Sequence, residues 1–107
     1  MKIIWTQYAL NDLQDIREHL KLNESPAFVK KVTREILTEV NSLKEWPHKG
    51  TLVPELEDLH LTNHRQLLAG QNRIIVERRD DNMLYVHMIA HTRRDLEGLI
   101  RRRLLNA

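Results

Sequence analysis

Arginine dominates the basic residues in the second half of this 107-residue sequence. All six lysines precede residue 50, and residues 61–107 carry nine arginines against five acidic residues. A guanidinium group presents a planar fork of donors that holds a carboxylate or phosphate at two points, whereas lysine acts as a point charge. We therefore expect this half to bind an anionic macromolecule, although arginines also serve simply to keep a small protein soluble. The expected binding residues are Arg65, Arg73, Arg78, Arg93, Arg94, Arg101, Arg102 and Arg103.

His91 raises the possibility of acid–base chemistry. Cleavage of RNA requires a base for the 2'-hydroxyl proton, an acid for the leaving oxygen and a cation for the charge on the phosphorane. His91, Arg73 and Arg65 could supply these groups if neighbouring strands bring them together. They could equally form a sheet edge that pairs with acidic residues of a partner protein, and a histidine at the end of a strand is often satisfied within its own fold.

The histidines give little indication of a metal site. Two pairs have the spacing H-x3-H, His60 with His64 and His87 with His91. On a helix such a pair is half of a plausible zinc site, but residues four apart on a strand are separated by about 13 Å. Because both pairs fall in or beside predicted strands, we expect no metal. The sequence contains no glycine-rich phosphate loop and no nucleotide fingerprint, so we also expect no cofactor.

Length and composition bound the class of protein. A chain of this size is expected to form a single domain over residues 1–107 with one core. It contains no cysteine, which excludes disulfides and thiolate metal sites. No window approaches the roughly 18 apolar residues that a membrane span requires, and the first ten residues do not resemble a signal peptide. We expect a cytoplasmic protein with no membrane association.

Helical periodicity predicts an αα-hairpin in the first half. Thr6 is placed to cap a helix that runs to about Leu22, and Ser25 is placed to cap a second helix with Pro26 in its first turn. Trp46 with Pro47 ends the second helix. The predicted buried stripes are Leu10, Leu13, Ile16 and Leu20 in the first helix, and Val29, Val32, Ile36, Val40 and Leu43 in the second. Asp12, Asp15 and Glu18 are expected on a solvated face, and Trp5 and Trp46 in the core.

The second half predicts strands. The segments HRQLLA, NRIIVER and MLYVHMIA are rich in branched or aromatic residues and are separated by Gly70-Gln71 and by Asp80-Asp81-Asn82. They form a predicted antiparallel meander, which residues 2–5 join as a further strand. Thr92 and Asp95 fit a capping box for a last helix over about residues 93–105. The predicted fold is α+β: a helical hairpin packed on a four-stranded antiparallel sheet, in the order β-α-α-β-β-β, with a C-terminal helix.

These segments, taken in order, resemble a known family. The pattern IIWTQYALNDLQDI, then SPAFVKKVTREILTEVNSLKEWPHKG, VPEL, HRQLL and NRIIVERRDDNMLYVHMIAHTRRD, is similar to the ParE/RelE superfamily of bacterial toxins from type II toxin-antitoxin systems. The resemblance covers nearly the whole chain. It implies the same helical hairpin on an antiparallel sheet that the periodicity predicts.

The superfamily has two branches with different activities. The RelE-like branch contains ribosome-dependent ribonucleases that cut messenger RNA with basic residues and a histidine or a C-terminal tyrosine; several of them have tyrosine at the position of Thr92. The ParE-like branch poisons DNA gyrase, and its members often end like AHTRRDLEGLIRRRLL. The resemblance therefore implies gyrase inhibition by binding, and the alternative is cleavage of messenger RNA on the ribosome with His91, Arg73 and Arg65. Either branch implies a cognate antitoxin with an acidic segment.

Overall fold

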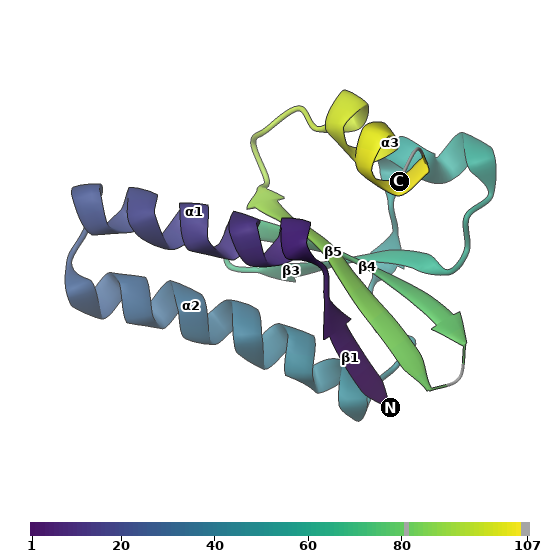
Figure 1. The fold of residues 1–107 in the computed structure, drawn as a ribbon, viewed down its shortest axis with the longest axis horizontal. Coiled ribbons are helices and arrows are strands. Elements are labelled where there is room, and N and C mark those ends of the chain that lie inside the picture. Colours follow the sequence, from purple (N-terminus) through teal and green to yellow (C-terminus); the bar gives the residue numbers. More distant parts are fainter. Residues whose placement is uncertain (81, 106–107) are drawn as a thin grey trace.

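The computed structural model describes residues 1–80 and 82–105, and in this part of the chain a five-stranded mixed sheet organises the fold (Figure 1). The strand order is β1-β5-β4-β3-β2. The strands are β1 (Lys2–Trp5), β2 (Thr51–Leu52), β3 (His64–Ala69), β4 (Asn72–Asp80) and β5 (Met83–His91). The predicted meander is confirmed as β3, β4 and β5, and Asp81 of its predicted second turn lies outside the described residues.

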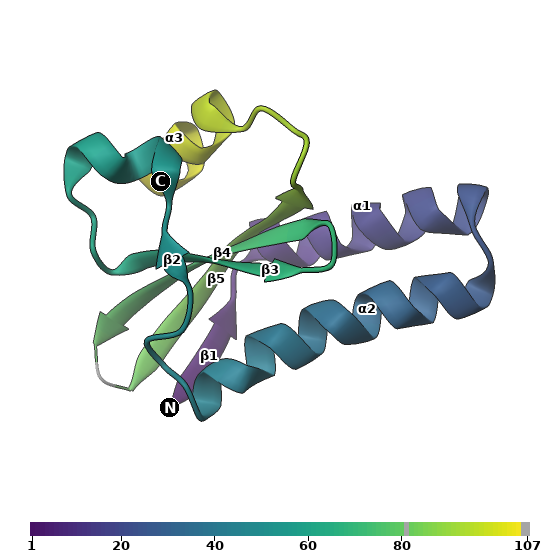
Figure 2. The same ribbon diagram turned by 180° about the vertical axis from the view of Figure 1, so that it is seen from behind.

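The sheet differs from the predicted four antiparallel strands in two ways. β1 pairs with β5 in parallel, with Lys2 in register with Met83, and β2 adds a short antiparallel strand beside β3 (Figure 2). The direction of β1 depends on how the long connection through the helices returns the chain, which the four residues KIIW do not encode. β2 follows Gly50, whose φ of +105° is a conformation that L side chains rarely adopt. A Cβ atom there would lie 2.7 Å from the carbonyl oxygen of Gln66.

The predicted helical hairpin is confirmed as α1 (Gln7–Asn23) and α2 (Pro26–Asn41), which lie side by side (Figure 1). Both predicted caps are present. The hydroxyl of Thr6 accepts a hydrogen bond from the amide of Ala9 at 3.2 Å, and the hydroxyl of Ser25 accepts one from Phe28 at 3.2 Å. A short 3-10 helix, η1 (Ser42–Lys44), follows α2.

The hairpin covers the first face of the sheet and buries the larger apolar cluster. The buried members of this cluster are Ala9, Ile36, Val40, Leu43, Leu67, Ala69, Ile74, Val76, Leu84, Val86 and Ile89. The predicted stripe of α2 is largely correct, whereas Leu10 of α1 is 46% exposed and Ala9 is fully buried in its place. A methyl side chain at this point allows α1 to approach the sheet closely.

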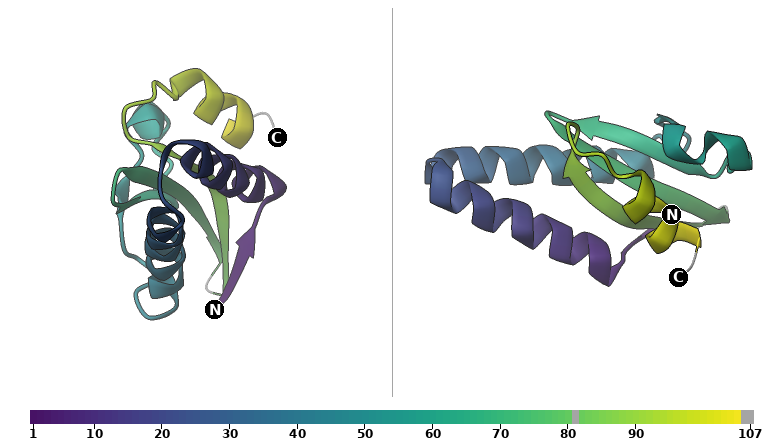
Figure 3. Two further views of the ribbon diagram at one scale, coloured as in Figure 1. Left: turned by 90° about the vertical axis from the view of Figure 1, so that its left-hand side faces the viewer. Right: turned by 90° about the horizontal axis from the view of Figure 1, so that it is seen from above.

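The second face of the sheet carries its own apolar cluster, beneath a second 3-10 helix, η2 (Pro54–Leu59), and the C-terminal helix α3 (Glu97–Leu105). Figures 1 and 3 show η2 and α3 together on one side of the molecule and α2 on the opposite side. The buried members are Val53, Leu56, Ile75, Met88, Ala90, Leu96 and Ile100. None of the helices in the described ranges has the length and hydrophobicity of a membrane span.

Helix α3 begins four residues later than the capping box predicts. The amide of Thr92 donates to the carbonyl of Gln71 at 2.9 Å, and the amide of Arg94 donates to the carbonyl of His91 at 3.1 Å. These bonds hold the segment in a turn that carries the chain from the sheet toward its second face. Asp95 then accepts from the amide of Glu97 at 3.3 Å.

A β-bulge in β5 reorients the side chains of its centre. Ile75 of β4 is in register with Met88, but the next residue, Val76, is in register with Val86. His87 is therefore the extra residue. It lies on the second face together with Met88, so that the alternation of the strand is interrupted at this point.

Candidate functional site

Arg73 is held inside the protein. It is 9% exposed, and its two terminal nitrogens donate to the two carboxylate oxygens of Glu55 at 2.6 and 2.7 Å. Its Nε and Nη2 atoms also donate to Gln66 Oε1, at 3.0 and 2.7 Å. The hydrogen bonds from Arg73 lower the pKa of Glu55 despite partial burial. Arg73 therefore ties η2 to the sheet, and its fork of donors is already occupied.

Two of the three C-terminal arginines are also paired within the fold. Arg101 lies 3.1 Å from a carboxylate oxygen of Asp58 and 3.5 Å from Glu97. Arg103 donates to both carboxylate oxygens of Asp12, at 2.7 and 3.1 Å, and its guanidinium lies 4.8 Å from the centre of the Tyr8 ring. These contacts fasten α3 to η2 and to α1.

Arg65 and Arg78 lie on the sheet. Arg65 is in register with Val76, a member of the first-face cluster, whereas Arg73 shares the second face with Gln66. Side chains alternate along a strand, so Arg65 and Arg73 lie on opposite faces. Arg78 contacts the ring of His48, with Nη1 2.9 Å from Nδ1.

Arg93, Arg94 and Arg102 form the remaining set, which we call the free arginines. All three are exposed, and within the described part of the chain their side chains make no hydrogen bond or ion pair. Arg94 and Arg102 line a shallow depression of about 720 Å³ beside α3, together with Arg101 and the acidic residues Asp95 and Glu97. The structure thus leaves cationic groups available where β5 passes into α3.

A groove of about 900 Å³ lies between the helical hairpin and the end of the sheet where β5 stops, and Arg94 also lines it. Its apolar lining consists of Ile16, Leu20, Phe28, Val32, Ile89 and Ala90. Its charged lining is mixed, with Asp12, Asp15, Glu24 and Glu35 against Lys31 and Arg94. The groove is therefore an apolar cleft with polar edges and not a basic channel.

His91 lies in this groove with both ring nitrogens engaged. Its Nδ1 accepts from the amide of Arg93 at 3.1 Å, so the proton of the neutral ring resides on Nε2, which donates to Gln71 Oε1 at 3.0 Å. This arrangement holds the ring in one tautomer. His91 is thus hydrogen-bonded within its own fold, which the sequence left open as the alternative to a catalytic role.

The structure does not bring His91, Arg73 and Arg65 together. His91 is in register with Asn72 and lines the groove with it, whereas the neighbouring residue Arg73 points to the opposite face. Arg65 shares the face of His91 but is level with Val76, so it lies about 13 Å further along the strand direction and two strands across the sheet. The three groups proposed for RNA cleavage therefore have no common site in this structure.

A cluster that the sequence did not predict lies on the second face. His64, Glu77 and His87 come from β3, β4 and β5, and Glu77 Oε1 lies 2.8 Å from His87 Nε2 and 3.8 Å from His64 Nε2. The rings of the two histidines stack with centroids 6.0 Å apart. One histidine comes from each H-x3-H pair, and the two meet across the sheet. Only the register and the bulge reveal this grouping.

The buried His64 predicts a pH dependence of stability. Burial lowers the pKa of His64 below its ordinary value of 6.5, although Glu77 opposes the shift. The unfolded chain therefore binds a proton at His64 more readily than the folded chain does. The contribution of the neutral ring to stability is fully present above pH 6.5 and is lost as the pH decreases toward the folded pKa. We expect the urea midpoint to be lower at about pH 5.5 than at about pH 7.5, and His64→Gln to weaken this dependence. His19→Gln, a change on the exposed face of α1, is the control, and equal pH slopes in the two variants would refute the assignment.

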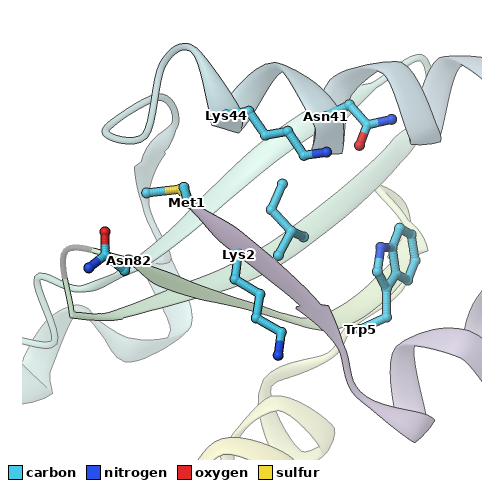
Figure 4. A pocket seen from close by; sticks show the side chains of 7 residues that line it. Met1, Lys2, Trp5, Asn41, Lys44 and Asn82 are labelled. Atoms are coloured by element: carbon cyan, nitrogen blue, oxygen red, sulfur yellow. The ribbon is translucent and has the colours of Figure 1, made fainter.

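The two tryptophans differ in their environment. Trp46 is 64% exposed, so its predicted place in the core is wrong. The amides of Glu45 and Trp46 donate to the carbonyl of Ser42, so the chain turns after η1. Trp5 packs against the first-face cluster and lines a shallow pocket of about 600 Å³ with Lys2, Asn41 and Lys44 (Figure 4). That pocket contains no histidine or carboxylate among its lining residues, so it offers no acid–base chemistry.

Comparisons with known proteins agree on one relationship. A family model described as the ParE toxin of the type II toxin-antitoxin system parDE matches residues 3–96. A solved structure described as "Chromosomal ParDE TA system from P. aeruginosa" superposes with a TM-score of 0.68 and 19% identity, over 85% of this chain and 95% of that chain. At this identity the likeness shows the fold. A comparison with curated proteins finds no match.

Proposed function

This chain belongs to the ParE toxin family of type II toxin-antitoxin systems, and from this premise we propose that it inhibits DNA gyrase by binding and not by enzymatic cleavage. The observation that carries the proposal is the separation of His91, Arg73 and Arg65. Their positions on two faces and at two ends of the sheet leave the ribonuclease alternative without an assembled site among the described residues. Inhibition by binding requires only an exposed, complementary surface.

The free arginines are the proposed contact with the target. Arg94 and Arg102 border one depression, and among the described residues neither forms an ion pair, although Asp95 and Glu97 line the same depression. Complexes of gyrase contain DNA, whose phosphates bind arginine at two points. Arg101 lines the same depression but is already paired with Asp58, so we expect it to hold α3 in place.

A cognate antitoxin is the second proposed partner, and the groove beside the hairpin is its proposed site. The apolar lining, which includes the 38%-exposed Phe28, suits a segment that folds on binding and inserts apolar side chains. Lys31 and Arg94 suit acidic residues of that segment, and the four carboxylates of the lining suit basic ones. Because Arg94 lines both the groove and the depression, a bound antitoxin would cover part of the surface proposed for gyrase.

The decisive experiment is a DNA cleavage assay with purified gyrase. We expect the protein to cause accumulation of cleaved DNA, and the double variant Arg94→Glu/Arg102→Glu to be weaker by about tenfold or more, equivalent to about 1.4 kcal/mol of lost binding. Arg34→Glu, at an exposed position on α2, is the matched control and should retain activity. Unchanged gyrase activity with the wild-type protein would reject the proposal.

Expression in cells separates the two branches. A gyrase inhibitor should cause filamentation and DNA damage signalling, and co-expression of a small protein encoded beside it, with an acidic tail, should relieve both effects. Arrest of translation with cut messages would instead support the ribonuclease. This activity also implies action in the cytoplasm.

A further inference from the structure

The side chains of His64, Glu77 and His87 meet on the second face of the sheet, one from each of three adjacent strands. Each offers a ligand atom, and these atoms all lie within 4.8 Å of one another. We propose that the three side chains bind a divalent transition metal ion, with zinc as the favoured ion. This site is independent of the proposed action on gyrase.

The distances suit a metal ion with little rearrangement. Zinc bonds to imidazole nitrogen and carboxylate oxygen are about 2.0–2.2 Å long, so ligand atoms around a tetrahedral ion lie roughly 3.3–3.5 Å apart. Glu77 Oε1 lies 2.8 Å from His87 Nε2 and 3.8 Å from His64 Nε2, on either side of that spacing. Small side-chain rotations bring the three atoms to one centre. His87 then carries its proton on Nδ1, which frees Nε2 to bind the metal.

The backbone holds these residues in place. His64 and Glu77 are register partners on β3 and β4. The bulge in β5 brings His87 to the same face, where Tyr85 stacks beside it with ring centroids 6.2 Å apart. A site on strands of one sheet is positioned more firmly than a site on loops.

The ligand set is one that zinc uses. Two histidines and one carboxylate hold zinc in several catalytic centres and leave the fourth position for water. Metal binding requires neutral imidazole and ionised carboxylate. The side chains are 10%, 19% and 13% exposed for His64, Glu77 and His87, so solvent reaches the site from one side.

Arg79 is the competing cation. Its Nε lies 3.2 Å from Glu77 Oε1, and its guanidinium lies 4.2 Å from the centre of the Tyr85 ring. Its side chain is 54% exposed, so it can move into solvent when an ion arrives. Since this movement costs its contacts with Glu77 and Tyr85, removal of the charge in Arg79→Gln should strengthen metal binding. If the cluster only stabilised the fold and bound no metal, Arg79→Gln would not increase the affinity for a metal ion.

The test is titration of the tag-free, chelator-treated full-length protein with Co²⁺ and with Zn²⁺. We expect one ion per chain, a visible Co²⁺ absorption spectrum that Zn²⁺ abolishes, and tighter binding by Arg79→Gln. His87→Gln should weaken zinc binding by at least about 100-fold, because loss of a ligand exceeds the 10–100-fold effect of outer partners. His19→Gln, at an exposed position on α1, should bind as the wild type does.

Nuclear magnetic resonance of the wild-type imidazoles identifies which histidines bind the metal, and it needs no variant that could fail to fold. Co²⁺ should broaden the signals of His64 and His87 first and leave those of His19, His48 and His60 sharp. Equal broadening of all histidines, the absence of saturable binding, or unchanged affinity in a folded His87→Gln protein would overturn the proposal.

Discussion

Arg73→Ala should lower the free energy of unfolding by about 3–5 kcal/mol, the effect of removing one partner from a buried ion pair. The side chains of Arg73 and Glu55 are 11% and 18% exposed, and two hydrogen bonds join them. Without the guanidinium, the carboxylate of Glu55 and the amide oxygen of Gln66 lose their donors while they remain largely enclosed. Urea denaturation measures the loss, and we expect the change in midpoint to be among the largest of any arginine substitution.

Matched variants separate this structural role from target binding. Arg102→Ala removes an exposed arginine and should change stability by no more than about 0.5 kcal/mol. A paired replacement of Glu55 and Arg73 by Gln and Met should recover part of the stability lost in Arg73→Ala, because no unpaired charge remains. If Arg73→Ala is as stable as Arg102→Ala, the buried pair does not support the fold. Arg73 would then again be a candidate for binding the target or for catalysis.

Asp12→Ala should destabilise the protein by about 3 kcal/mol, near the low end of the range for a buried pair because Arg103 keeps its contact with the Tyr8 ring. Asp12 accepts two hydrogen bonds from Arg103 and a third, of 3.0 Å, from the amide of Ile89. One carboxylate thus joins α1, β5 and α3. Its removal leaves the buried amide of Ile89 and the charge of Arg103 without this partner.

The neighbouring Asp15→Ala is the control for Asp12→Ala, since Asp15 is exposed on the same helix. Hydrogen exchange adds a local measurement: the amides of Ile89 and Ile100 should exchange faster in Asp12→Ala, because α3 loses its attachment to α1. Equal stability of the two variants would show that α3 is held by its apolar contacts alone.

The helices, their caps and the strand meander could be predicted from the sequence because each depends on near neighbours. The caps at Thr6 and Ser25 require only a hydroxyl and an amide three residues later. The meander follows from branched residues separated by turn residues. The same local reasoning failed at Thr92, where a hydrogen bond to Gln71 holds the chain in a turn and delays the start of α3.

The direction of β1 and the roles of the charged side chains were decided by contacts between distant parts of the chain. Arginine chemistry was visible in the sequence, but the sequence did not show that Arg73 meets Glu55 or that Arg103 meets Asp12, which helical periodicity had placed on a solvated face. In the same way, His64 and His87 meet only because strand register and a bulge align them. Periodicity reports which face of an element is apolar, whereas the partner of a polar group depends on how elements pack, and packing is set by the whole chain.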